Sequence, residues 1–217
     1  IVATGQLGDI AKEAVENISA VIKKYTMSNL TDVDIHLQYI GTYTGVEGDS
    51  ASITMATVII SALENIPIRQ DLAMTGSLNV RGQVLPIGAV TAKLEAAAKA
   101  GIKMALIPES NAKDVMMEDR YYDMLEVYSV SNLRDVLEYA FVDCPLKTQF
   151  LEKLLPLTPD GKSTAYRLEK PEASSEPVKG EPVEKTVETA GTETEPEPEP
   201  EQISDSERTS GGSPCGA

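Results

Sequence analysis

The chain has 217 residues, of which 41% are hydrophobic and 24% are charged, and its formal net charge is −15 at pH 7. Residues 171–217 hold 12 of the 34 acidic residues but only three of the 19 basic ones, so most of the excess negative charge lies there. This acidity argues against nucleic-acid binding, which needs basic patches that neutralise phosphates. No apolar run approaches the ~20 residues that span a bilayer, and no phosphate-binding P-loop is present, which excludes a P-loop ATPase within this sequence.

Composition divides the chain into three parts. Aliphatic residues are concentrated before Pro156, and a domain of about 150 residues can bury enough surface for its own core. We predict a domain over residues 1–145, a C-terminal extension over residues 146–170 and a disordered acidic tail over residues 171–217. Acid and proline alternate over residues 193–201, as in extended segments without a core. Cys144 and Cys215 match no disulfide or metal-binding pattern, so we expect free thiols in a reducing compartment.

The first elements follow from hydrophobic periodicity. Residues 1–4 predict a short strand, and residues 5–8 predict a turn. Apolar residues then recur at helical spacing from Asp9 to about Lys24, which predicts an amphipathic helix. Residues 33–40 alternate between apolar and polar side chains and predict a half-buried strand. The only histidine, His36, falls on the polar face of that strand, so it is not expected to act as a catalytic base, although histidine is the commonest one.

A turn of small residues comes next, with the sequence GVEGDSAS over residues 45–52, followed by an apolar run to Leu63. This pattern predicts a buried central helix over residues 50–64, with Ser50 at its start. Two interpretations are open. Asp49 or Ser50 caps the helix, which is the common role of such residues, or Ser50 is a nucleophile beside the free amides of the helix N-terminus.

The following stretch supplies a second candidate group. Residues 71–78 and 79–85 predict two strands in a hairpin-like arrangement, in which Thr75 is either an ordinary strand residue or a hydrogen-bonding support. Residues 88–100 predict a helix that Gly101 closes. Lys93 lies near the start of this helix, where the dipole disfavours a cation and so favours a neutral amine. Taken alone, Lys93 would be interpreted as an exposed surface lysine, and only its pairing with the Ser50 stretch favours a catalytic role.

The remaining elements alternate between strands and helices. We predict a strand over residues 102–107, a short helix over 111–117, a loop over 120–122, a strand over 125–130 and a helix over 131–141. This order predicts an α/β (α+β) fold in which a mixed sheet is packed with helices.

Together, residues 45–52 and 71–93 resemble the proteolytic domain of Lon proteases, and the GDSAS form is similar to the archaeal branch. The resemblance runs from Ile1 to about Ala140. It implies the Lon proteolytic-domain fold and a serine endopeptidase that hydrolyses peptide bonds in protein quality control. The serine–lysine dyad of the family falls on Ser50 and Lys93, which are 43 residues apart, and the threonine that orients it falls on Thr75.

The resemblance also implies partners and missing parts. Family members carry an ATPase module that uses ATP and magnesium, assemble as hexamers, and in the archaeal type are membrane-anchored. We expect this chain to be an N-terminally truncated, cytoplasmic fragment without a cofactor or metal of its own. Its expected substrates are peptides and unfolded or misfolded proteins, and a homo-oligomer is expected. The alternative function is a non-catalytic α/β assembly module whose acidic tail binds a partner.

The dyad chemistry sets conditions on the neighbouring groups. Lys93 needs its pKa lowered from about 10.4 to roughly 7–8 to act as a base, and burial acts in that direction. Backbone amides of Asp49, Ser50 and Ala51 are expected to hold the oxyanion. The carboxylates of Glu47 and Asp49 would raise the pKa of Lys93. We therefore expect the loop to hold them away, or their approach to mark an inactive state. Loop solvation and capping are the alternative roles for both acids.

Overall fold

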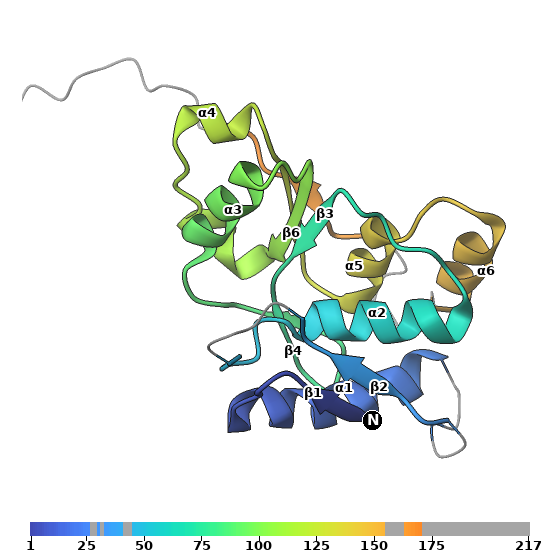
Figure 1. The fold of residues 1–217 in the computed structure, drawn as a ribbon. Helices are drawn as coiled ribbons and strands as arrows, with labels where there is room; N and C mark the ends of the chain where they lie inside the picture. Colours follow the sequence, from blue (N-terminus) through green and yellow to red (C-terminus); the bar gives the residue numbers. More distant parts are fainter. Residues whose placement is uncertain (27–29, 31–32, 41–44, 155–162, 171–217) are drawn as a thin grey trace, which may run out of the picture. The chain divides into compact units, whose positions relative to one another are not determined.

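The computed structural model describes residues 1–26, 30, 33–40, 45–154 and 163–170, all within the first of two compact units, Ile1–Ala173 (Figure 1). The second unit, Ser174–Ala217, lies outside the described residues, and so do Cys215 and the predicted acidic tail. The description below concerns the first unit only.

The N-terminal part confirms the predicted strand and helix. Strand β1 (Val2–Thr4) pairs in parallel with β2 (His36–Gln38), and helix α1 (Asp9–Thr26) lies between them in the chain. β2 is shorter than the strand predicted over residues 33–40. Its alternation persists, because Ile35, Leu37 and Tyr39 pack against the core while His36 is exposed. Val33, which was expected on the buried face, is exposed.

Helix α2 (Ser52–Glu64) is the central helix of the larger hydrophobic core. Ile53, Ala56 and Ile60 are fully buried, and the helix packs against α1 and against α5 (Leu133–Ala140). It begins two residues later than predicted, so Ser50 precedes the helix. It is also not buried on all sides, because Val58 faces solvent with 42% of its surface exposed.

The main sheet has four strands in the order β3 (Leu72–Met74), β6 (Met104–Pro108), β7 (Glu126–Val130) and β8 (Tyr166–Arg167). The first three are parallel, and β8 joins antiparallel at the edge. All of β6 is buried, as expected for an inner strand covered on both faces. Met104 and Leu106 enter the core of α1 and α2, whereas Ala105 and Ile107 enter a second cluster with α3 (Val90–Lys99). The sheet therefore lies between two helical layers, which confirms the predicted fold class (Figure 1).

The hairpin differs from the prediction. Strands β4 (Ser77–Leu78) and β5 (Val84–Leu85) form an antiparallel hairpin. The strand predicted over residues 71–78 is broken at Thr75 and Gly76, because its first half pairs with β6 instead. This break separates the main sheet from the hairpin, and it lies beside Ser50.

Two short helices also differ from the prediction. The helix predicted over residues 111–117 is a 3-10 helix, Glu109–Asp114. The loop predicted over residues 120–122 belongs to α4 (Asp119–Tyr122), because Tyr121 turns inward and is 3% exposed.

Helix α6 (Pro145–Leu154) and strand β8 were not predicted. Phe150, Leu151 and Leu154 enter the same core as α2, and residues 166–167 complete the sheet. Cys144 is a free thiol. Within the part of the chain that the structure describes, no helix is both long enough and apolar enough to cross a lipid bilayer.

Candidate active site

The position of Ser50 is set by the chain between β3 and β4. The carbonyl oxygen of Ser50 accepts hydrogen bonds from the Gly76 amide at 2.8 Å and from Thr75 Oγ1 at 3.2 Å. The amide of Ile53, in the first turn of α2, donates to the Gly76 carbonyl at 3.2 Å. The turn that carries Ser50 is therefore bound to the residues that follow strand β3, at Ser50 itself and at the start of α2.

Gly76 allows this close approach because it has no side chain. A Cβ atom built at Gly76 would lie 3.0 Å from Val84 Cγ1 and 3.1 Å from Ile53 Cδ1. Both distances are shorter than an ordinary van der Waals contact. A side chain at this position would therefore require Val84 and Ile53 to shift.

The capping interpretation of Ser50 and Asp49 is wrong. The N-cap residue of α2 is Ala51, and no side chain makes a capping hydrogen bond there. Ser52, one position further, donates from Oγ to the Asp49 carbonyl at 2.6 Å and stabilises the turn. The Ser50 hydroxyl is therefore not used by the helix and is free to contact another group.

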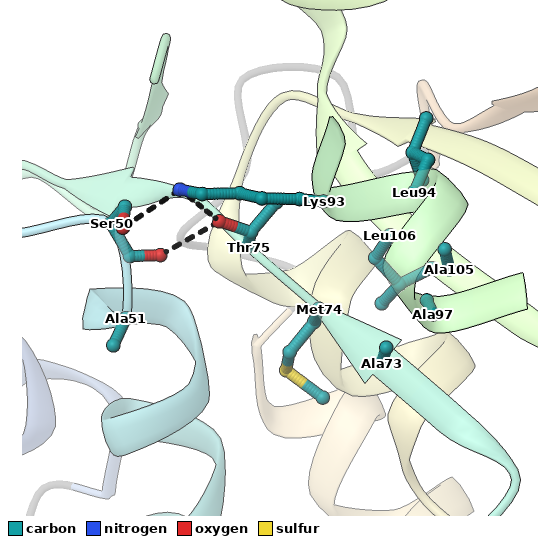
Figure 2. Close-up of a pocket in the computed structure, with 10 residues that line it drawn as sticks. All are labelled: Ser50, Ala51, Ala73, Met74, Thr75, Lys93, Leu94, Ala97, Ala105 and Leu106. Atoms are coloured by element: carbon teal, nitrogen blue, oxygen red, sulfur yellow. Dashed lines mark hydrogen bonds between the residues drawn. The ribbon is translucent and has the colours of Figure 1, made fainter. Parts of the chain in front are cut away.

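That group is Lys93. From the start of α3, the Lys93 side chain extends to Ser50, where Nζ donates to Oγ at 3.0 Å, and Nζ also lies 3.3 Å from Thr75 Oγ1 (Figure 2). Thr75 accepts from the lysine and donates to the Ser50 carbonyl, so it contacts both residues. The structure thus brings together Ser50 from the turn before α2, Thr75 from the break after β3, and Lys93 from α3.

The environment of Lys93 favours its neutral form. Burial lowers the pKa of Lys93, while the negative charge of Asp49 acts in the opposite direction and raises it. Among the residues that the structure describes, no carboxylate forms an ion pair with Lys93. Burial is the larger influence, so the amine has a pKa below its ordinary value.

The two acids of the loop are directed to other partners. Asp49 Oδ2 accepts a hydrogen bond of 2.5 Å from Ser77 Oγ on β4. Glu47 is exposed, and its carboxylate lies directly over Gly8, where a side chain would collide with it. Neither acid pairs with Lys93 in this conformation, but their functional roles stay predictions.

The amides expected to hold an oxyanion are those that precede α2. The backbone N–H groups of Asp49, Ser50 and Ala51 donate to no residue within the described ranges. They precede a helix of 13 residues, whose N-terminus adds a positive partial charge. These amides can therefore stabilise a negative charge that forms beside Ser50.

Two cavities open beside this centre, and Ser50 and Lys93 line both. The first has a volume of about 260 Å³ and is largely apolar, with Ala73, Ala97 and Leu106 among the residues in its wall (Figure 2). The second has a volume of about 480 Å³ and is lined by residues 48–50 and 86–88. Ser50 and Lys93 thus lie between an apolar recess and a more open space.

Several residues of the site were not foreseen from the sequence. Asn111 is buried and fixes the position of Ile87, which lines the second cavity. Its side chain accepts a hydrogen bond from the Ile87 amide at 2.8 Å and donates one to the Ile87 carbonyl at 3.1 Å. Ser77, the partner of Asp49, looks like an ordinary strand residue in the sequence. The only available signal was the run of small polar residues at Thr75, Gly76 and Ser77.

Other candidates lie apart from this centre. His36 is exposed on β2 and lines neither cavity. Within the described ranges, no group of three or more metal-ligating side chains is found.

A strained residue precedes the helix that carries Lys93. Ala89 is the N-cap residue of α3 and has a φ of +56°, a left-handed conformation that costs a non-glycine residue about 1–2 kcal/mol. Ala89 is exposed, so replacing it removes little buried surface.

We expect Ala89→Gly to raise the free energy of unfolding by about 0.5–1 kcal/mol, because the relief of strain exceeds the entropic cost of glycine. Thermal denaturation should show an increase in Tm of about 1–4 °C. Ala100→Gly is the control, because Ala100 has a φ of −76° and gains nothing from glycine. A fall in Tm for Ala89→Gly contradicts the assignment of strain.

Comparisons with known proteins agree with this geometry. Residues 1–143 match the family described as the Lon protease (S16) C-terminal proteolytic domain. The chain is 55% identical over 159 residues to the Archaeal Lon protease of Thermococcus kodakarensis, covering 73% of this chain and 25% of that protein. It is 58% identical over 142 residues to the Archaeal Lon protease of Methanothermobacter thermautotrophicus, covering 65% and 22%.

A more distant relative is the Lon protease of Brucella abortus, which is 39% identical over 160 residues and covers 70% of this chain and 20% of that protein. The chain thus spans about a quarter of the length of the curated relatives it matches. The family match covers most of the described residues, including Ser50, Thr75 and Lys93. The chain belongs to the family of Lon protease C-terminal proteolytic domains.

Proposed function

We propose that this chain is the proteolytic part of a serine endopeptidase in which Ser50 is the nucleophile and Lys93 is the general base. The observation that carries the proposal is the 3.0 Å contact between Lys93 Nζ and Ser50 Oγ, in a setting that lowers the pKa of the lysine. A serine hydroxyl needs such a neighbouring base, because it is a poor nucleophile while it is protonated.

The acylation step follows from these positions. Neutral Lys93 takes the hydroxyl proton as Ser50 Oγ bonds to the carbonyl carbon of the substrate. The amides of Asp49, Ser50 and Ala51 stabilise the oxyanion of the tetrahedral intermediate. The C–N bond then breaks, the lysine ammonium gives its proton to the leaving amine, and the acyl group stays on Ser50.

Hydrolysis of the acyl-enzyme uses the same groups. Lys93, neutral again, takes a proton from a water molecule that attacks the ester carbonyl. Collapse of the second tetrahedral intermediate breaks the bond to Ser50 Oγ, which recovers its proton from Lys93. The peptide is released with a new carboxyl group, and the enzyme returns to its starting state.

The proposed substrates are peptides and unfolded or misfolded proteins. The apolar cavity of about 260 Å³ beside Ser50 suits an apolar side chain next to the scissile bond, because burial of apolar surface supplies binding energy. Homo-oligomeric assembly, supply of substrate by an ATPase module with ATP and magnesium, and a cytoplasmic location belong to the same proposal, and they rest on the family resemblance.

Thr75 is proposed to orient the pair. We expect Thr75→Val to lower kcat about 10–100-fold, because two hydrogen bonds worth roughly 0.5–1.5 kcal/mol each are lost while the shape of the side chain is kept. Thr75→Ser is the matched control and should retain most of the activity, since it keeps the hydroxyl. Peptide hydrolysis at saturating substrate measures both. A wild-type kcat in Thr75→Val would show that Thr75 is only a strand residue.

The proposal is tested by covalent labelling of the full chain. A fluorophosphonate that reacts with activated serines should modify Ser50, as located by mass spectrometry of the digested protein. Prior incubation with a peptide aldehyde bearing a small apolar side chain should protect Ser50. Labelling that is absent from Ser50, or that is spread over exposed serines, would favour the non-catalytic assembly module instead.

A further inference from the structure

Asp49 lies at the boundary between two cavities. It lines the space of about 480 Å³ that Lys93 and Ser50 also line. It also lines a separate cavity of about 290 Å³ together with Ser77 and Ser52, on the side of α1. The residue therefore has room on two sides, and only one of them contains the lysine.

The Asp49 carboxylate is hydrogen-bonded to a residue of the hairpin. Ser77 Oγ donates to Asp49 Oδ2 at 2.5 Å, and a serine hydroxyl has only one proton to donate. Ser77 is 5% exposed and lies on strand β4, which packs against both α1 and α2. The donor is thus held by the fold, and it lines the 290 Å³ cavity but not the cavity that Lys93 lines.

The direction of the carboxylate has a chemical consequence. An opposite charge within roughly 4–6 Å of a titrating group favours its charged form and changes its pKa by about 1–3. For a lysine the change is a rise in pKa. In its present position, Asp49 already raises the pKa of Lys93 against the larger effect of burial. A carboxylate turned into the shared cavity would approach Nζ and stabilise the ammonium form, which cannot take the proton from Ser50.

We propose that Ser77 is a positioning residue that holds the Asp49 carboxylate away from Lys93 and thereby keeps the base neutral. The proposal deepens the proposed function and rests on it, because the neutral amine matters only if Lys93 is the base. Two further acids face this region within the described residues, because Glu47 lies on the same loop and Glu13, which is exposed, lines the 290 Å³ cavity from α1. Neither of them lines the cavity that holds Lys93.

The primary test is the pKa of Lys93 itself, measured by NMR on the full chain with lysine labelled at Cε and Nζ. The resonance of Lys93 is assigned by its disappearance in Lys93→Arg. We expect Ser77→Ala to raise the pKa of Lys93 by about 1 or more. In an Asp49→Asn background, Ser77→Ala should leave that pKa unchanged, because no carboxylate remains to be released.

Kinetics supply the second readout. Because only the neutral lysine is active, Ser77→Ala should shift the acidic limb of the kcat–pH profile to higher pH. The shift should equal the rise in the Lys93 pKa measured by NMR. At a pH below that limb, activity should fall about tenfold for each pH unit by which the limb moves, with little change in KM. Ser77→Thr keeps a hydroxyl and should retain the wild-type profile. Ser77→Cys, a weak donor of nearly the same size, replaces Ser77→Ala if the alanine variant does not fold.

The outcomes separate the possible explanations. An unchanged Lys93 pKa in Ser77→Ala overturns the proposal, and so does an equal rise in the presence and absence of Asp49. The NMR measurement does not depend on turnover. A chain that shows the expected pKa change but no Ser50-dependent hydrolysis therefore contradicts the proposed function and leaves the control of Asp49 by Ser77 standing.

Discussion

Replacing Ser50 by alanine should lower kcat/KM for peptide hydrolysis by at least about 10⁴-fold, the scale on which nucleophile loss acts in serine peptidases. The side chain makes its hydrogen bond to Lys93, while its backbone carbonyl holds the turn to Gly76 and Thr75. The backbone contacts survive the substitution. The variant should therefore retain the wild-type circular dichroism spectrum and lose only the reaction, which a fluorogenic peptide and unfolded casein both measure.

Ser61→Ala is the matched control for this experiment. Ser61 lies on α2, the helix that follows Ser50, and its hydroxyl donates to the Ile66 carbonyl at 2.6 Å. Its loss should cost about 1 kcal/mol of stability and leave the rate intact. A loss of activity in Ser50→Ala that is far smaller than this would show that another residue attacks the substrate.

The second large effect is expected for Lys93→Arg, which should lower kcat by about 10²–10⁴-fold, the range attributed to general base catalysis. Arginine is a long cationic side chain like protonated lysine, but its guanidinium is not deprotonated in proteins and cannot act as a base. The wild-type rate should rise with pH as Lys93 loses its proton, and the midpoint should lie below the ordinary pKa of lysine, because burial lowers it. The residual rate of the variant should lack this rise.

Lys99→Arg is the control for charge and shape on the same helix. Lys99 is exposed, lies near the C-terminal end of α3 and pairs with Glu95 at 3.6 Å, so arginine replaces it without loss. Its kcat–pH profile should superimpose on that of the wild type. If Lys93→Arg keeps both the rate and the pH dependence, the base is a different group, and the contact with Ser50 serves only the structure.

Local patterns predicted the elements whose sequences carry a clear period. The helix that begins at Asp9 and the buried strand before Pro108 appear close to their predicted positions, because periodicity follows directly from which face of an element is buried. The strand over residues 33–40 and the hairpin were predicted less well. Their lengths depend on pairing with partners such as β1 and β6, which no local pattern contains.

The amino-acid sequence was enough to establish the α/β class and to single out Ser50, Lys93 and Thr75, since two motifs at the right separation resemble one family. Tertiary packing was needed to place Lys93 Nζ 3.0 Å from Ser50 Oγ and to attach Asp49 to Ser77. It also placed Ser50 ahead of the helix, where it caps nothing. These three features share one cause. Each depends on contacts between residues that lie far apart in the chain. These contacts form only when the sheet, the hairpin and the two helices have packed together.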